Sequence, residues 1–84
     1  EKYKNLLIEQ DIGLILAPQD GDRFLWEENT RLLLKARQEV KWLVDNVFLG
    51  QGVNIIFTPQ GPGTYQIEAS IGQKKQRISI SLVP

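Results

Sequence analysis

Ser70, Ser79 and Ser81 are the three serines of the chain and its nearest approach to a nucleophilic catalyst. An acylating serine needs a base close by, which serine enzymes supply in motifs such as Ser-x-x-Lys, Lys-Thr-Gly or Gly-x-Ser-x-Gly. None of these motifs occurs here, and the chain contains no histidine and no cysteine. The serines alternate with apolar residues, so we expect them on the solvent side of strands. The sequence therefore predicts no catalytic residue and a chain that is not an enzyme.

Two pairs of neighbouring acidic residues could in principle bind a metal ion or act as a catalytic pair. Asp20 and Asp22 flank Gly21, where a calcium ion would need six or more oxygen ligands and finds few. Capping of a turn is the favoured interpretation for both aspartates. Glu27 and Glu28 are adjacent, and adjacent side chains of an extended chain point apart, so they cannot flank one scissile bond. We predict no metal site and no cofactor.

Binding chemistry is carried by one tryptophan and a small basic cluster. Trp26 closes a short apolar run next to two glutamates, so it forms either a lid over one end of the core or an exposed platform for a sugar or a partner. Lys74, Lys75 and Arg77 lie around a polar turn, where cations usually serve solubility and protect strand edges. Trp26, Lys74 and Lys75 are the candidate binding residues.

Composition limits the classes of partner. Hydrophobic residues make up 42% of the 84 residues and charged residues 24%, as in a folded single domain. Ten basic residues balance ten acidic ones, which argues against nucleic acid and against a polybasic membrane-surface module. No run of 18 apolar residues is present, so we expect no direct insertion of these residues into a membrane. The chain begins at Glu1 and has no methionine, which suggests a piece of a longer protein.

Period-two alternation predicts the elements that must position these residues. Residues 64–71 and 77–83 alternate strictly and predict a hairpin closed by a polar turn over residues 72–76. Residues 31–37 also alternate, with Leu33 as the exception, although a helix over residues 27–44 is the rival prediction because many of its residues favour helices.

A second hairpin follows at residues 40–49. Val40, Trp42 and Val44 share one face of a strand, and the Asp45-Asn46 pair suits a two-residue turn because both residues tolerate positive φ. We expect Trp42 in the core, together with Ile67 and Ile80, and Tyr65 in the core or at a corner. These assignments place every second residue of each of these strands in the core.

The remaining strands are shorter. We place them at residues 14–17, 23–26, 47–49 and 53–58, with the strand that begins at residue 47 ended by Gly50-Gln51-Gly52. About seven short strands in so small a chain are typical of an immunoglobulin-like antiparallel β-sandwich. Residues 1–11 are assigned to a linker or lead-in segment, and residues 12–84 to the domain.

An ordered series of motifs from residue 12 to residue 83 resembles the C-terminal domain of class A penicillin-binding proteins of the 1C type. The series consists of Pro18-x-Asp20-Gly21-Asp22-x-Phe24, Leu32-x-Leu34-x-Ala36, Val40-x-Trp42-Leu43-Val44-Asp45-Asn46-x-x-Leu49-Gly50, Gly61-Pro62-Gly63-Thr64-Tyr65 and a final hairpin. Asn46 stands where that family usually has glycine, and Ile71-Gly72-Gln73 replaces the aspartate of its last turn.

The resemblance implies a parent enzyme that is anchored in the inner membrane and faces the periplasm. Such a parent polymerises glycan with a glycosyltransferase and cross-links peptides with a penicillin-sensitive transpeptidase. None of the family's catalytic motifs falls within this chain. The domain is then expected to be an accessory module that docks a partner protein, braces the transpeptidase domain or contacts peptidoglycan. The alternative is a carbohydrate-binding or adhesive immunoglobulin-like module of another cell-surface protein.

Overall fold

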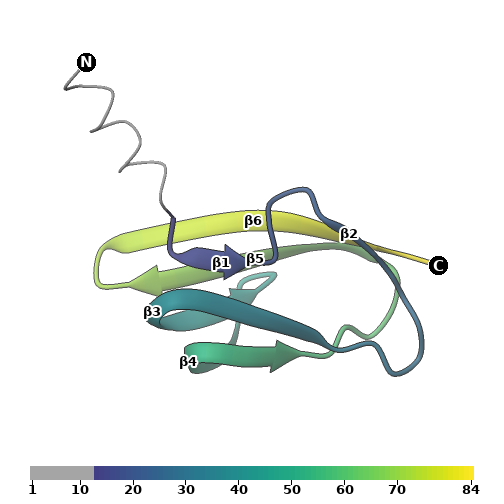
Figure 1. Cartoon of the computed structure of the whole chain (residues 1–84), viewed down its shortest axis with the longest axis horizontal. Helices are drawn as coiled ribbons and strands as arrows, with labels where there is room; N and C mark the ends of the chain where they lie inside the picture. Colours follow the sequence, from purple (N-terminus) through teal and green to yellow (C-terminus); the bar gives the residue numbers. More distant parts are fainter. Residues whose placement is uncertain (1–12) are drawn as a thin grey trace, which may run out of the picture.

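The computed structural model describes residues 13–84, so the linker predicted for residues 1–11 lies outside the described range. Every helix or strand in residues 13–84 is a β-strand (Figure 1), which confirms the all-β prediction and makes the rival helix over residues 27–44 wrong. The strands are β1 (Ile15–Ala17), β2 (Arg23–Leu25), β3 (Leu32–Val44), β4 (Val47–Phe57), β5 (Gly63–Ile71) and β6 (Lys74–Val83). A search of the same residues for a helix that could cross a bilayer found none.

β3 organises the sheet because it pairs with three other strands. β4 runs antiparallel along one edge of β3, from Phe57 opposite Leu32 to Val47 opposite Val44. The other edge of β3 is shared by β1, beside residues 35–36, and by β5, beside residues 41–44. The sheet continues from β5 through β6 to β2, so its order is β1-β3-β5-β6-β2 with β4 on the far side of β3.

The long β3–β4 ribbon bends, and the single sheet curls with it (Figure 1). The pairing of β3 with β4 shifts register twice, within residues 35–40 and at residues 42–43, and such bulges increase local twist and bending. Gly52 has a φ of 148°, a conformation that favours glycine. At Gly50 the space that a Cβ would fill is occupied by the side chain of Ile55. Glycine at both positions therefore suits the bend.

The structure differs from the predicted sandwich in three respects. β3 continues through residues 37–40, where its pairing with β4 shifts register. β4 continues through residues 50–52, because glycine here bends the strand rather than ending it. Residues 13–84 therefore hold six strands, all in one curled sheet, and a two-sheet sandwich of about seven strands is not confirmed. The sheet is also not wholly antiparallel, since β2 pairs parallel with β6, with Arg23 opposite Ser81.

The core lies on the inner side of the curled sheet, and its residues come from the sides of the strands that were predicted to face inward. Trp42 and Ile67 are fully buried and Ile80 is almost so, which confirms the predicted core. The indole Nε1 of Trp42 donates a hydrogen bond of 3.0 Å to the carbonyl of Gly52. The other buried apolar residues are Leu14, Leu32, Leu34, Ala36, Val40, Val44, Phe57, Ala69, Ile78 and Leu82.

The two hairpin turns differ in how well they were predicted. Asp45 and Asn46 form the expected two-residue turn, with φ values of 51° and 69°. The Asp45 Oδ1 also accepts a hydrogen bond from the backbone N–H of Gln66 at 2.9 Å. The turn between β5 and β6 is shorter than predicted, because Gly72 adopts a φ of 58° and reverses the chain within two residues. Residues 74–76 consequently belong to β6.

Candidate interaction surface

The two turn aspartates act as caps, as predicted. The Asp22 Oδ2 accepts a hydrogen bond from the backbone N–H of Gln19 at 2.9 Å, within the turn. The Asp20 Oδ1 accepts one from the backbone N–H of Ser79 in β6 at 2.8 Å. Each carboxylate therefore has a structural partner: Asp22 closes the turn before β2, and Asp20 fastens that turn to β6.

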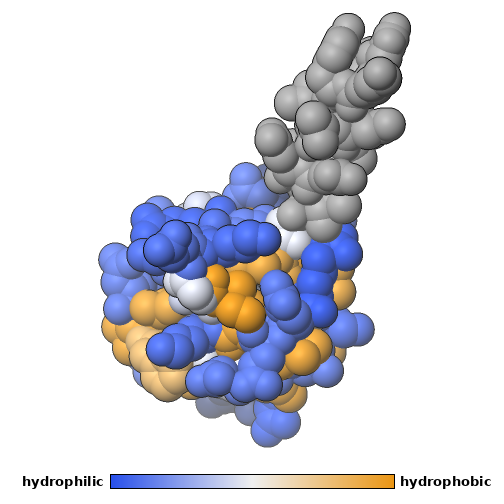
Figure 2. Space-filling view, turned by 90° about the vertical axis from the view of Figure 1, so that its left-hand side faces the viewer, coloured by the Kyte–Doolittle hydropathy of each residue, from blue (hydrophilic) through white to orange (hydrophobic). Residues whose placement is uncertain are grey.

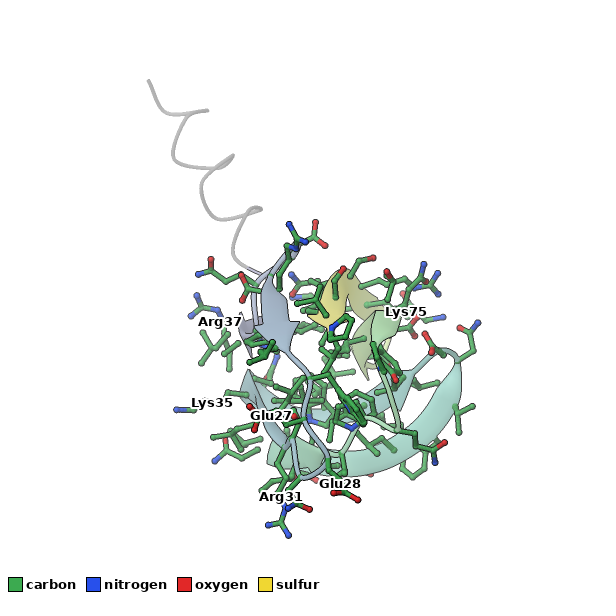
Figure 3. The ribbon with its side chains drawn as sticks, turned by 90° about the vertical axis from the view of Figure 1, so that its right-hand side faces the viewer. Glu27, Glu28, Arg31, Lys35, Arg37 and Lys75 are labelled. Atoms are coloured by element: carbon green, nitrogen blue, oxygen red, sulfur yellow. The ribbon has the colours of Figure 1, made fainter. Side chains whose placement is uncertain are left out.

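The other candidate chemical groups lie apart. Ser70, Ser79 and Ser81 occupy the outward, partly exposed phase of β5 and β6. Glu27 and Glu28 are exposed in the loop between β2 and β3 (Figure 3). Within residues 13–84, no three acidic, histidine or cysteine side chains lie close enough to share a metal ion. Ser70 lines an open pocket of about 430 Å³ together with Lys41 and Glu39, so it is the one of the three serines with ionisable side chains around a shared hollow.

Trp26 is a half-buried residue that packs against the core. Its backbone N–H donates a 2.7 Å hydrogen bond to the carbonyl of Val83, which extends the pairing of β2 with β6 by one residue. Its indole Nε1 is buried and makes no hydrogen bond with the described part of the chain. This placement matches the lid alternative and not the exposed platform.

Lys74 and Lys75 are exposed at the first two positions of β6. They lie opposite Ile71 and Ser70 of β5, so both cations project from the strand and not from the polar turn predicted for residues 72–76. Arg77 follows on the same strand, and its guanidinium forms a 2.9 Å salt bridge with Glu68. The basic cluster is therefore partly neutralised on its β5 side.

Trp26 and the two lysines do not form one site. Trp26 is bonded to Val83 at the end of β6, whereas Lys74 begins the same strand nine residues earlier. At about 3.3 Å per residue, this separation is on the order of 30 Å. β6 thus holds Trp26 and the two lysines, the candidate binding residues, at opposite ends of its length.

An exposed apolar surface was missed by sequence reasoning. Figure 2 shows apolar side chains exposed among hydrophilic ones on the end of the molecule that lies at the left of Figure 1. The large hydrophobic residues exposed within the described chain are Leu16, Leu25, Leu33, Val47, Phe48, Val53 and Ile56. Four of these seven belong to β4, which contains no charged residue and is apolar on both of its phases. That two-phase pattern was the signal in the sequence.

Part of this surface lies beside basic side chains. Leu33 pairs with Ile56 across the β3–β4 ribbon, and both side chains are about half exposed. Lys35 and Arg37 continue the outward phase of β3, and Leu16 is exposed on the adjacent β1. Figure 3 shows Lys35 and Arg37 pointing outward on the same side of the molecule. We call Leu16, Leu33, Lys35, Arg37 and Ile56 the outer face.

A shallow groove of about 540 Å³ is lined by residues from both ends of the bent β4, and Ile56 of the outer face belongs to its lining. Phe48, Phe57 and Tyr65 contribute its aromatic lining, and its polar groups come from Asp45, Thr58 and Gln60. The rings of Phe57 and Tyr65 meet edge to face, with centroids 5.3 Å apart. Because Phe57 is buried, Phe48 is the aromatic residue of this groove with the most exposed ring.

Tyr65 forms the predicted corner. Its side chain is half-buried, and its hydroxyl donates a 2.7 Å hydrogen bond to the carbonyl of Gly61. This bond runs four residues back along the chain, as in the tyrosine corners of β-sandwich domains. The loop between β4 and β5 is thereby fastened beside the groove.

Comparison of the chain with protein-family models, with curated proteins and with solved structures gave no match in any of the three.

Proposed function

We propose that this chain is a non-catalytic interaction domain that docks a protein partner through its outer face. The observation that carries the proposal is the pairing of Leu33 with Ile56, two large apolar side chains that are 49% and 52% exposed on one sheet face. Apolar residues that gather at the surface typically mark interaction sites. Lys35 and Arg37 beside them would orient a partner that carries acidic groups.

The parent protein in this proposal is a bifunctional peptidoglycan synthase that combines a glycosyltransferase with a penicillin-sensitive transpeptidase. Support comes from the ordered motifs that resemble the C-terminal domain of class A penicillin-binding proteins of the 1C type. The partner would then be the neighbouring transpeptidase domain or another protein in the periplasm, and the parent would be anchored in the inner membrane. The immunoglobulin-like classification belongs to the same proposal, supported by Leu34 and Trp42, which enter one core from the two halves of the bent β3.

A carbohydrate-binding or adhesive module remains the second candidate, and the groove beside Phe48 favours it. An exposed ring next to polar groups is the usual platform for a sugar. The groove offers one well-exposed ring, and Trp26 packs against the core instead of joining it. The apolar pair on the outer face therefore supports protein docking more strongly than glycan binding.

The test measures binding of the 84-residue chain to two immobilised ligands by biolayer interferometry. One ligand is the transpeptidase domain of a class A penicillin-binding protein from the same organism, and the other is purified peptidoglycan. We expect saturable binding to the transpeptidase domain that Leu33→Ser weakens about tenfold or more, because this substitution removes an apolar contact at the centre of the outer face.

Leu25→Ser is the matched control, because Leu25 is 61% exposed on β2, outside the outer face. This control is expected to leave binding unchanged. Binding to peptidoglycan alone, abolished by Phe48→Ser, would replace the docking function with the carbohydrate-binding one. Absence of binding to both ligands would contradict the proposal.

A further inference from the structure

β4 is an edge strand with an unusual composition for its position. It pairs with β3 and with no other strand in residues 13–84, so its second edge is open along its length. The strand has 11 residues, whereas β1 and β2, which end the main path of the sheet, have three each. β4 is thus the longest stretch of unpaired strand edge in the described chain.

The usual protections of an open edge are scarce on β4. Natural edge strands are shortened, charged, interrupted by proline or twisted by bulges, because an open row of N–H and C=O groups is a template for another strand. β4 contains no charged residue and no proline, and its protection is limited to the two register shifts. Val47, Phe48, Val53 and Ile56 are also 44–67% exposed along it.

From this edge we infer that β4 pairs with β4 of a second copy of the chain, joining two curled sheets edge to edge. Antiparallel pairing of a strand with itself is self-complementary, since a two-fold axis relates the contacts that the two copies make. A strand without charge places no like charges opposite each other in that arrangement. The chain as a whole carries a formal net charge of zero, so long-range repulsion between copies is also absent.

Pairing of two β4 strands would remove some of the exposed apolar side chains from water. Ile56 lies on the stretch of β4 that is regularly paired to β3 from Asn54 to Phe57, and Val53 lies directly beside that stretch, at the register shift. A second β4 would satisfy open main-chain groups and would cover part of these apolar side chains. This self-association goes beyond the docking function, because it requires neither a transpeptidase partner nor a glycan.

The mass of the 84-residue chain in solution tests the inference. We expect sedimentation equilibrium over a dilution series to show reversible association from the 9.6 kDa chain to twice that mass. Val53→Lys should weaken the dimer about tenfold or more, because it puts a charge on each of the two facing edges. Leu25→Lys, at a comparably exposed site on β2, should leave the dissociation constant unchanged.

A cross-linking experiment separates loss of pairing from loss of folding. The chain has no cysteine, so a single Asn54→Cys substitution, at an exposed position of β4, gives a unique thiol. A bismaleimide should link two such chains in high yield, and the same substitution at Gln73, in the β5–β6 turn, should not. A chain that stays monomeric at every concentration, or cross-links equally well from both positions, would overturn the inference. A monomer that still binds the transpeptidase domain would contradict only the dimer, and a dimer that binds neither ligand would contradict only the proposed function.

Discussion

The side chain of Gln76 in β6 accepts a 2.8 Å hydrogen bond at Oε1 from the backbone N–H of Ile15 in β1, 61 residues away in the sequence. Gln76 occupies the inward phase of β6, where the next two inward positions are Ile78 and Ile80. It also lies so close to Gly13 that a Cβ there would collide with its amide group. One polar side chain at the edge of the core therefore joins β1 to a strand with which β1 shares no ladder.

Substitution of this glutamine should destabilise the fold. Gln76→Leu keeps the approximate size of the side chain but leaves the Ile15 N–H without its partner, so we expect a loss of about 1–3 kcal/mol in the free energy of unfolding. Urea denaturation followed by tryptophan fluorescence measures the loss. Gln73→Leu, at an exposed turn position, should change stability by less than about 0.5 kcal/mol. Equal effects of the two substitutions would show that the bond to Ile15 does not contribute.

The two tryptophans should differ in their contribution to stability. Trp42 is fully buried and donates its indole N–H to Gly52, so Trp42→Ala should cost about 3–5 kcal/mol. Trp26 is half-buried and makes no side-chain hydrogen bond with the described residues, so Trp26→Ala should cost clearly less. Chemical denaturation monitored by far-ultraviolet circular dichroism ranks the two variants. Similar losses for both would contradict the difference in burial.

Replacing Asn46 in the β3–β4 turn by glycine and by a β-branched residue should affect stability differently. Asn46 adopts a φ of 69°, a region that glycine enters freely and valine avoids. We expect Asn46→Gly to keep or raise the melting temperature, and Asn46→Val to cost about 1–3 kcal/mol. Thermal unfolding of both variants provides the measurement. The turn geometry would be wrong if the valine variant were as stable as the original protein.

The chain should not react covalently with penicillin. Acylation needs a serine whose proton is taken by a positioned base, and donors that stabilise the oxyanion. Ser70, Ser79 and Ser81 lie on the outward phase of β5 and β6, and none of them belongs to an acylation motif. Ser70 lies opposite Lys41 and lines an open pocket with Lys41 and Glu39, but the pair lies on the outer side of the sheet and has no Ser-x-x-Lys spacing. We expect no label after incubation with fluorescent penicillin and denaturing electrophoresis, with an intact penicillin-binding protein as the positive control. A covalent label on the chain would refute both the non-catalytic assignment and the proposed accessory role.

The sequence by itself determined which side of β3, β5 and β6 faces the core. Alternation has a period of two, which is a local property, and it placed Trp42, Ile67 and Ile80 inside before any partner strand was known. The Asp45-Asn46 turn was determined in the same way, because its two positive φ values depend on the residues in the turn. These features need no knowledge of distant parts of the chain.

Only the tertiary structure decided how the strands are joined and which apolar side chains stay exposed. Local pattern predicts the end of a strand at Gly50 and Gly52, but backbone pairing to β3 carries β4 through them, and they permit the bend instead. The parallel pairing of β2 with β6, and the distance between Trp26 and Lys74, follow from contacts between segments far apart in the sequence. Local pattern cannot specify such contacts, because the same alternating strand can pair with several partners and in either direction. The choice among them comes from the packing of the whole core, which here leaves the uncharged β4 on an open edge.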